Sequence, residues 1–240
     1  MTFKEIKEQA KTAIEGNRKT SLGGIVLVVF ISMVLGGFIG GISGGFLADG
    51  YFAAYNAIQQ LGSHTVSIFI AVPLSAGLVW LHLDIFDKVQ TRSANVFQGF
   101  KPYWKVVGAH ALVMLYTMLW SILLVIPGII KGLAYSQTLY ILKDKPELGV
   151  VAALDESERL MKGNKWRIIG FNLSFILWYL PTFILVGALI AFGAAGLTGW
   201  VIASAIALIA YNVFFIVYFA PYYHTAVSGF YRSLTTKSEQ

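Results

Sequence analysis

The sequence predicts an all-α fold: a polytopic membrane bundle of six transmembrane helices, arranged as three helical hairpins with amphipathic interfacial helices. The 240 residues are 57% hydrophobic and only 12% charged, whereas about a quarter of the residues of a soluble domain carry charge. Long uncharged runs recur from end to end without a polar linker, which predicts a single integral membrane domain over residues 1–240. The basic residues are also confined to alternate connections between these runs, as the positive-inside rule requires.

The apolar runs locate most of the spans. A span needs about 20 mainly apolar residues. The first run, at 26 uncharged residues, is longer than the apolar region of a cleaved signal peptide, about 7–15 residues, so we expect it to remain as a span. The clear spans are expected at about Leu22–Leu47, Val66–Leu83, Val106–Ile126, Ile168–Ile190 and Trp200–Ala220.

The region after the third run has two interpretations. Between Val106 and Leu142 the only charged residue is Lys131, and the helix-breaking pair Pro127–Gly128 lies near the middle. Two helices joined by a tight turn fit this pattern. One span followed by an interfacial helix fits it too.

The distribution of Lys and Arg favours the hairpin. The connections 48–65 and 191–199 contain no Lys or Arg. Every basic residue except Lys131 falls on one side of the membrane only if the chain turns back at Pro127. We therefore expect a short fourth helix from about Gly128 to Leu142, and both termini in the cytoplasm.

The chain also shows a threefold internal repeat. Each odd span follows a junction of glycine and basic residues: EGNRKTSLGG, QGFKPYWKVVG and KGNKWRIIG. Each even span carries a proline, and an aromatic with charges follows: LHLDIFDK, LYILKD and SGFYRSL. The repeats are expected over residues 1–91, 92–145 and 146–240, irregularly spaced, with Pro73, Pro127 and Pro221 as hinges.

The segment PELGVVAALDESERLMKG has the pattern of an interfacial helix. Its charged residues lie opposite an apolar face, as a helix at the headgroup boundary requires. Trp104 and Trp166 fall where aromatic belts occur. The apolar face is expected to comprise Leu148, Val151, Ala152, Leu154, Leu160 and Met161.

A family resemblance rests on residues Trp120 to Leu180. This segment contains the elements IPGIIKGLAYS, SERLMKGNKWR and LSFILWYL. It resembles the uncharacterised bacterial integral membrane family catalogued as domain of unknown function 975. The resemblance implies a multi-span protein of the bacterial cell membrane, and it supplies no activity, ligand or catalytic residue.

Glycines four residues apart form two ridges in the first span. Small residues at this spacing let helix backbones approach closely in lipid, so a glycine-zipper packing seam within the chain or between protomers is expected. A water-lined or ligand-lining groove is the alternative. The ridges consist of Gly36, Gly37, Gly40, Gly41, Gly44 and Gly45.

Lys131 is the only charged side chain inside a predicted span, and such charges often mark functional sites. Its long stem could reach the outer headgroups, or its ammonium could bind an anionic group such as a lipid phosphate. Interhelical hydrogen bonding is the alternative for the polar residues of the spans. The candidate ligand or lipid contacts are Lys131, Tyr135, Gln137, Tyr140, His110 and Asn172.

No catalytic, metal or cofactor site is expected. The chain has no cysteine, its four histidines are isolated in the sequence, and no phosphate-binding glycine motif occurs. Topology and anionic lipid account for the basic residues, so no nucleic-acid partner is expected. Ser43 and His224 would lie near opposite membrane surfaces, too far apart for a protease pair.

Two functions are therefore expected from the sequence. The first is a non-enzymatic scaffold, regulatory or partner subunit that contacts anionic membrane lipids and forms a homo-oligomer or binds another membrane protein. The alternative is a transporter or lipid-handling protein that uses the proline-interrupted even helices and Lys131.

Overall fold

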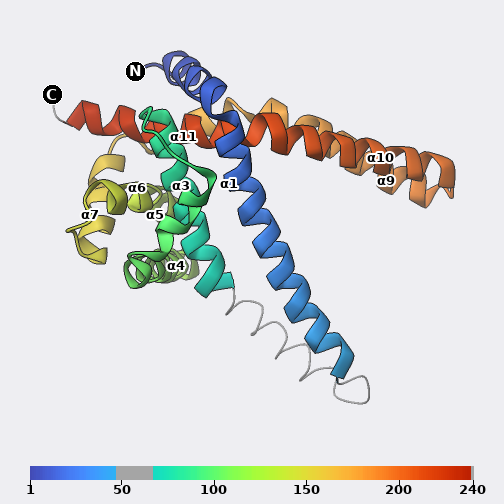
Figure 1. The fold of residues 1–240 in the computed structure, drawn as a ribbon, viewed down its shortest axis with the longest axis horizontal. Coiled ribbons are helices and arrows are strands. Elements are labelled where there is room, and N and C mark those ends of the chain that lie inside the picture. Colours follow the sequence, from blue (N-terminus) through green and yellow to red (C-terminus); the bar gives the residue numbers. More distant parts are fainter. Residues whose placement is uncertain (47–66, 239–240) are drawn as a thin grey trace.

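The computed structural model describes residues 1–46 and 67–238, and it describes the side chains of residues 1–34 and 69–236. Within these ranges the chain is helical (Figure 1), which confirms the all-α class. The α-helices are α1 (Phe3–Phe46), α3 (Val72–Phe86), α4 (Tyr103–Leu123), α5 (Val125–Ala134), α6 (Thr138–Asp144), α7 (Val150–Met161), α8 (Lys165–Leu173), α9 (Leu180–Ala194), α10 (Thr198–Phe214) and α11 (Ala220–Ser238). Shorter turns are η1 (Ser67–Ala71), η2 (Ser93–Phe100), η3 (Ile176–Trp178) and η4 (Phe215–Phe219).

Several helices are long and apolar enough to cross a membrane. Four continuous stretches in the described residues meet this description, and the pair α8 to α9, bent by 51°, would make a fifth. The multi-span prediction is thus supported, while the count of six is not reached. The four stretches are Phe3–Val34, Phe69–Phe86, Tyr103–Leu123 and Thr198–Thr236.

Two of the even segments change from π-helix to α-helix next to a proline. Pro73 and Pro221 each occupy the second position of a helix that follows a π-helical turn, η1 and η4 respectively. Proline lacks an N–H and crowds the carbonyl four residues before it, and a π-helical turn widens the backbone at that point. The helical geometry of these two segments therefore changes beside their prolines, whereas Pro127 lies inside α5.

The fourth predicted helix differs from the expectation. The chain turns at Leu124, whose backbone is extended (φ −159°, ψ 136°), so the turn comes before Pro127. The predicted helix over Gly128–Leu142 is wrong as a single element, because α5 ends at Ala134 and α6 begins at Thr138.

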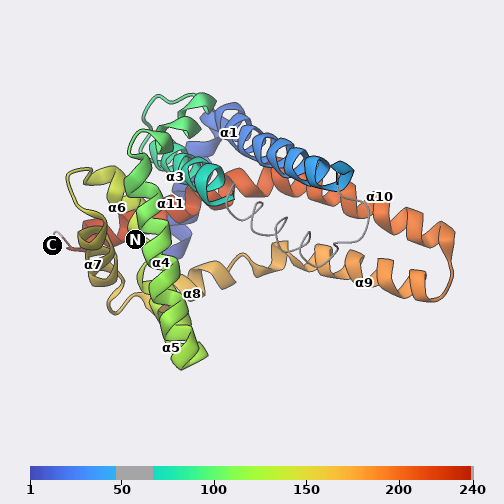
Figure 2. The same cartoon turned by 90° about the horizontal axis from the view of Figure 1, so that it is seen from below.

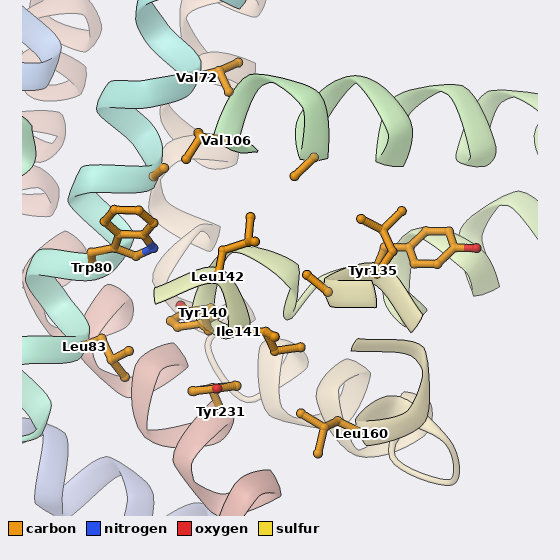
Figure 3. Close-up of a cluster of buried hydrophobic side chains, with 14 residues drawn as sticks. Val72, Trp80, Leu83, Val106, Tyr135, Tyr140, Ile141, Leu142, Leu160 and Tyr231 are labelled. Carbon is orange, nitrogen blue, oxygen red and sulfur yellow. The ribbon is translucent and has the colours of Figure 1, made fainter. Parts of the chain in front are cut away.

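The packed core lies where α3, α6, α7 and α11 meet the N-terminal part of α1, a region that we call the hub. One buried cluster joins Trp80, Leu142, Leu160 and Tyr231 from α3, α6, α7 and α11 (Figure 3). A second joins α1, α8 and α11, and its buried residues include Ile6, Ala10, Phe171, Phe175, Phe219 and Phe230. The amphipathic segments thus bury their apolar faces against protein.

Two pairs of helices extend from the hub in different directions (Figures 1 and 2). Helix α4 packs against α5, and α9 packs against α10; we call these pairs the α4–α5 arm and the α9–α10 arm. Most of their apolar side chains are exposed, for example Ile122 at 71%, Ile126 at 70% and Ile209 at 65%. Lipid is the solvent that suits such surfaces.

The turn η2 lies directly against α3. A Cβ atom added at Gly99 would overlap the backbone carbonyl of Pro73, and one added at Gly77 would overlap the carbonyl of Val96. These glycines allow backbone to touch backbone, which a larger residue would prevent.

Candidate functional site

Lys131 lies in the last turn of α5 and forms an ion pair with α7. Its Nζ atom is 2.7 Å from Oε1 and 2.9 Å from Oε2 of Glu158. The rings of Trp120 and Tyr135 lie 5.6 and 5.7 Å from the same ammonium, within reach of cation–π attraction. The sequence predicted that Lys131 contacts outer headgroups or an anionic group. In the structure a carboxylate holds it, and lipid contact stays a prediction.

The charged face of α7 carries two open depressions. The larger, about 510 Å³, is lined by Asp155, Glu158, Arg159, Lys162 and Lys165. The smaller, about 330 Å³, is lined by residues that include Lys145 and Glu156. Both lie outside the helix bundle and contain charges of both signs.

Glu156 is held by two cations. Its carboxylate lies 2.6 Å from Nε of Arg159 and 2.8 Å from Nζ of Lys145. The hydrogen bonds from Arg159, and then those from Lys145, lower the pKa of Glu156 to about 2. Glu156 is therefore ionised at neutral pH, and it links α7 to the residues that follow α6.

A second polar site joins the ends of three helices, and we call it the carboxylate–arginine network. The Arg232 guanidinium of α11 donates from Nε to Oδ1 of Asp87 at 2.9 Å, just after α3. It also donates from Nη1 and Nη2 to Asp144 at the end of α6. The hydroxyl of Tyr231 donates to Oδ2 of Asp144 at 2.9 Å. The planar fork of a guanidinium presents five N–H donors, so it can bond both oxygens of two carboxylates at once, which an ammonium with three donors cannot match.

Lys143 extends the network toward α3. Its Nζ atom lies 2.6 Å from Oδ1 of Asp84 and donates to the carbonyl of Trp80 at 2.5 Å. Burial lowers the pKa of the Lys143 ammonium, and the hydrogen bond to Asp84 opposes that shift. The indole of Trp80 donates in turn to the carbonyl of Leu139 at 2.8 Å.

The break between α5 and α6 is closed by Ser157 of α7. The backbone N–H of Gln137 donates to Ser157 Oγ at 3.1 Å, and that hydroxyl donates to the carbonyl of Ala134 at 2.7 Å. The side chain of Gln137 is 1% exposed, and its Oε1 has no hydrogen-bond partner among the described residues. Ser157 thus satisfies backbone groups that the break exposes.

The other predicted contacts are dispersed. Tyr140 lies in the hub, stacked on Tyr231 with ring centroids 4.9 Å apart. Asn172 of α8 accepts a hydrogen bond from the Tyr223 hydroxyl at 3.0 Å. His110 is exposed on α4. Of the predicted set, the structure brings only Lys131 and Tyr135 together. The side chains around Gly36, Gly37, Gly40, Gly41, Gly44 and Gly45 lie outside the described residues, although the backbone there is part of α1.

Sequence reasoning missed the partners in these sites. Glu158, Asp87, Asp144 and Arg232 were not singled out, although the last three lie in the repeated aromatic and charged motifs. A buried serine–histidine contact was also missed: Ser21 Oγ lies 2.8 Å from Nε2 of His82. Across the described residues, no group of three or more His, Asp or Glu side chains could hold a metal ion.

Comparison with known protein families gives a match. The family model described as "Protein of unknown function (DUF975)" matches residues 122–238, about half of the chain. The matched region runs from the tip of the α4–α5 arm through α11, so it contains Lys131, Glu158 and Arg232. No curated protein and no solved structure matches the chain.

Proposed function

We propose that this chain, which its residues 122–238 place in the DUF975 family of unknown function, is a non-enzymatic scaffold, regulatory or partner subunit of a bacterial cell membrane. The six apolar segments enter the membrane as three hairpins, and both termini lie in the cytoplasm. This proposal rests on the positive-inside pattern of the Lys and Arg residues and on the long apolar helices.

The separation of polar and apolar surfaces in the described residues supports the proposed role. The ion pairs of the described residues lie in the hub or along α7, where they tie helices to one another. The arms present apolar side chains outward. A protein built in this way offers surfaces for lipid and for partner helices, while the charged groups of these ion pairs hold its own helices together.

Native mass spectrometry of the protein, gently extracted from its own membrane, tests this role. The expected result is a reproducible protein partner or a second copy of the chain, in a mass that withstands mild activation. A protein that carries neither across several extraction conditions would contradict the scaffold role.

A lipid-handling or transport role is the second candidate. The interruptions of the even segments at Pro73, at Pro221 and between α5 and α6 favour it, since broken helices line binding sites in carriers. A stoichiometric anionic lipid or solute, lost in Lys131→Ala and kept in the control Lys11→Ala, would support it. Lys11 is exposed on α1.

A further inference from the structure

The tip of the α4–α5 arm presents a continuous apolar surface. Ile122 and Leu124 are 71% and 67% exposed, and Ile126 is 70% exposed. We infer that this arm binds the acyl chains of the cytoplasmic leaflet alone and does not cross the membrane. The inference rests on the proposed placement of the chain in a membrane.

The ion pair between Lys131 and Glu158 sets the depth of the arm. Lys131 lies seven positions after the turn at Leu124, which corresponds to about 10 Å along the helix. The hydrocarbon core is about 30 Å thick. If the turn reached the far side, the ion pair would lie roughly 20 Å below the cytoplasmic boundary.

If the ion pair lay at that depth, the other charged residues of α7 would have to enter the bilayer with it. Helix α7 packs against both α4 and α5, and Asp155 and Arg159 lie within a turn of Glu158 on the same short helix. A charge near the bilayer centre costs about 2.5–3.5 kcal/mol on insertion scales. With the pair at the cytoplasmic boundary, these groups stay in water and only the tip of about 10 Å enters lipid.

The direction of the arm agrees with this depth. The α4–α5 arm runs across the direction of α9 and α10 (Figure 2), so the two arms cannot both stand along the membrane normal. Helices α9 and α10 contain no charged residue. A hairpin that returns to the cytoplasmic side also leaves the distribution of Lys and Arg unchanged, because its two ends lie on the same side.

Site-directed spin labelling tests the inference. The chain has no cysteine, so Leu115→Cys and Ile126→Cys each carry one label, at positions 48% and 70% exposed. The labelled protein is placed in bilayers of phosphatidylethanolamine and phosphatidylglycerol. Collision rates with oxygen and with a water-soluble nickel chelate then give the depth of each label.

The order of the two depths decides the outcome. In a hairpin that crosses, Leu115 lies near the bilayer centre and Ile126 lies about 10 Å nearer the outer surface. We expect Ile126 to be at least as deep as Leu115. A deeper label at Leu115 would overturn the inference. Low oxygen collision rates at both positions would also overturn it, since they would show protein in place of lipid.

The α9–α10 arm supplies the matched control. Ile209→Cys and Leu197→Cys label exposed positions, 65% and 46%, in the middle of α10 and at the turn before it. Ile209 is expected to be the deeper of the two. If this control fails, the proposed membrane placement fails with it. If the control holds and the α4–α5 order is reversed, only the further inference fails.

Discussion

Removing Arg232 tests the carboxylate–arginine network most directly. In Arg232→Met, Asp87 and Asp144 lose the guanidinium that bridges them, and Tyr231 is left as the donor to Asp144. The side chain of Arg232 is 26% exposed, so the network is between a surface pair and a buried one. The three helices α3, α6 and α11 then lose their shared contact.

The expected loss follows from that intermediate burial. Exposed pairs contribute about 0–1 kcal/mol, while removing one partner of a fully buried pair costs about 3–5 kcal/mol. Arg232→Met should therefore lower the free energy of unfolding by about 2–3 kcal/mol. Arg232→Lys should recover less than half of this, because an ammonium has only three donors and cannot form bidentate pairs with the carboxylates.

Unfolding by SDS in mixed micelles, followed by tryptophan fluorescence, measures the effect. Arg92→Met is the matched control, since Arg92 is exposed and precedes η2; its free energy of unfolding should stay within about 0.5 kcal/mol of the parent. A loss in Arg232→Met no larger than in Arg92→Met would refute the network. So would full recovery by Arg232→Lys.

Three further predictions address single contacts. Gly99→Ala should destabilise the protein by about 1–3 kcal/mol, because the new methyl group meets backbone of α3, whereas Gly16→Ala, with open space around it, should be neutral or stabilising in thermal melts. A double-mutant cycle with Lys131→Met and Glu158→Met in SDS unfolding should give a coupling free energy of about 1–2 kcal/mol for this partly exposed pair; a value near zero would contradict the pair. The pKa of Glu156 falls from 4.5 to about 2 on folding, so its stabilisation is present above pH 4.5 and is lost as the pH falls toward 2. The melting temperature of Glu156→Gln should therefore change less with pH across this window than that of the parent protein. The difference should correspond to no more than about 1 kcal/mol in the free energy of unfolding. Equal slopes of melting temperature against pH in the two proteins would refute this prediction.

The sequence predicted the all-α fold class. Long uncharged runs act locally, so α-helical structure was foreseeable. The short α6 was not, because its separation from α5 depends on Ser157 of α7, which binds the backbone on both sides of the break. That contact is a tertiary one, and the hydrophobic periodicity of a helical sequence does not predict it.

The buried face of α7 is a second feature that hydrophobic periodicity does not predict. The expected apolar face included Val151 and Ala152, yet both are exposed, and Ala153, Leu154 and Leu160 are buried. A hydrophobic stripe tells which side of a helix is apolar. It does not tell whether lipid or protein covers that side, nor which edge of the stripe faces the core.

The candidate site was foreseeable only as single residues. Lys131 stood out as a lone charge in an apolar run, but Glu158 lies 27 residues further along the chain in a segment where charges are common. Similarly, the repeated motifs at the ends of the even segments were visible in the sequence, while their meeting in one network was not. Pairing between distant segments depends on helix packing that composition does not determine.

The ion pairs determine which charged side chains remain available to the surface that faces the membrane. Those seen among the described residues engage five acidic side chains, Asp84, Asp87, Asp144, Glu156 and Glu158, and five basic ones. Because pairing engages equal numbers of acidic and basic side chains, the net charge of +6 is unchanged. Lys165 and Arg167 flank the exposed Trp166, and Lys165 lines the same depression as Glu158. Each basic residue near an anionic surface contributes about 1 kcal/mol, so this junction should hold the hub against the cytoplasmic leaflet, the position that the inferred depth of the α4–α5 arm requires.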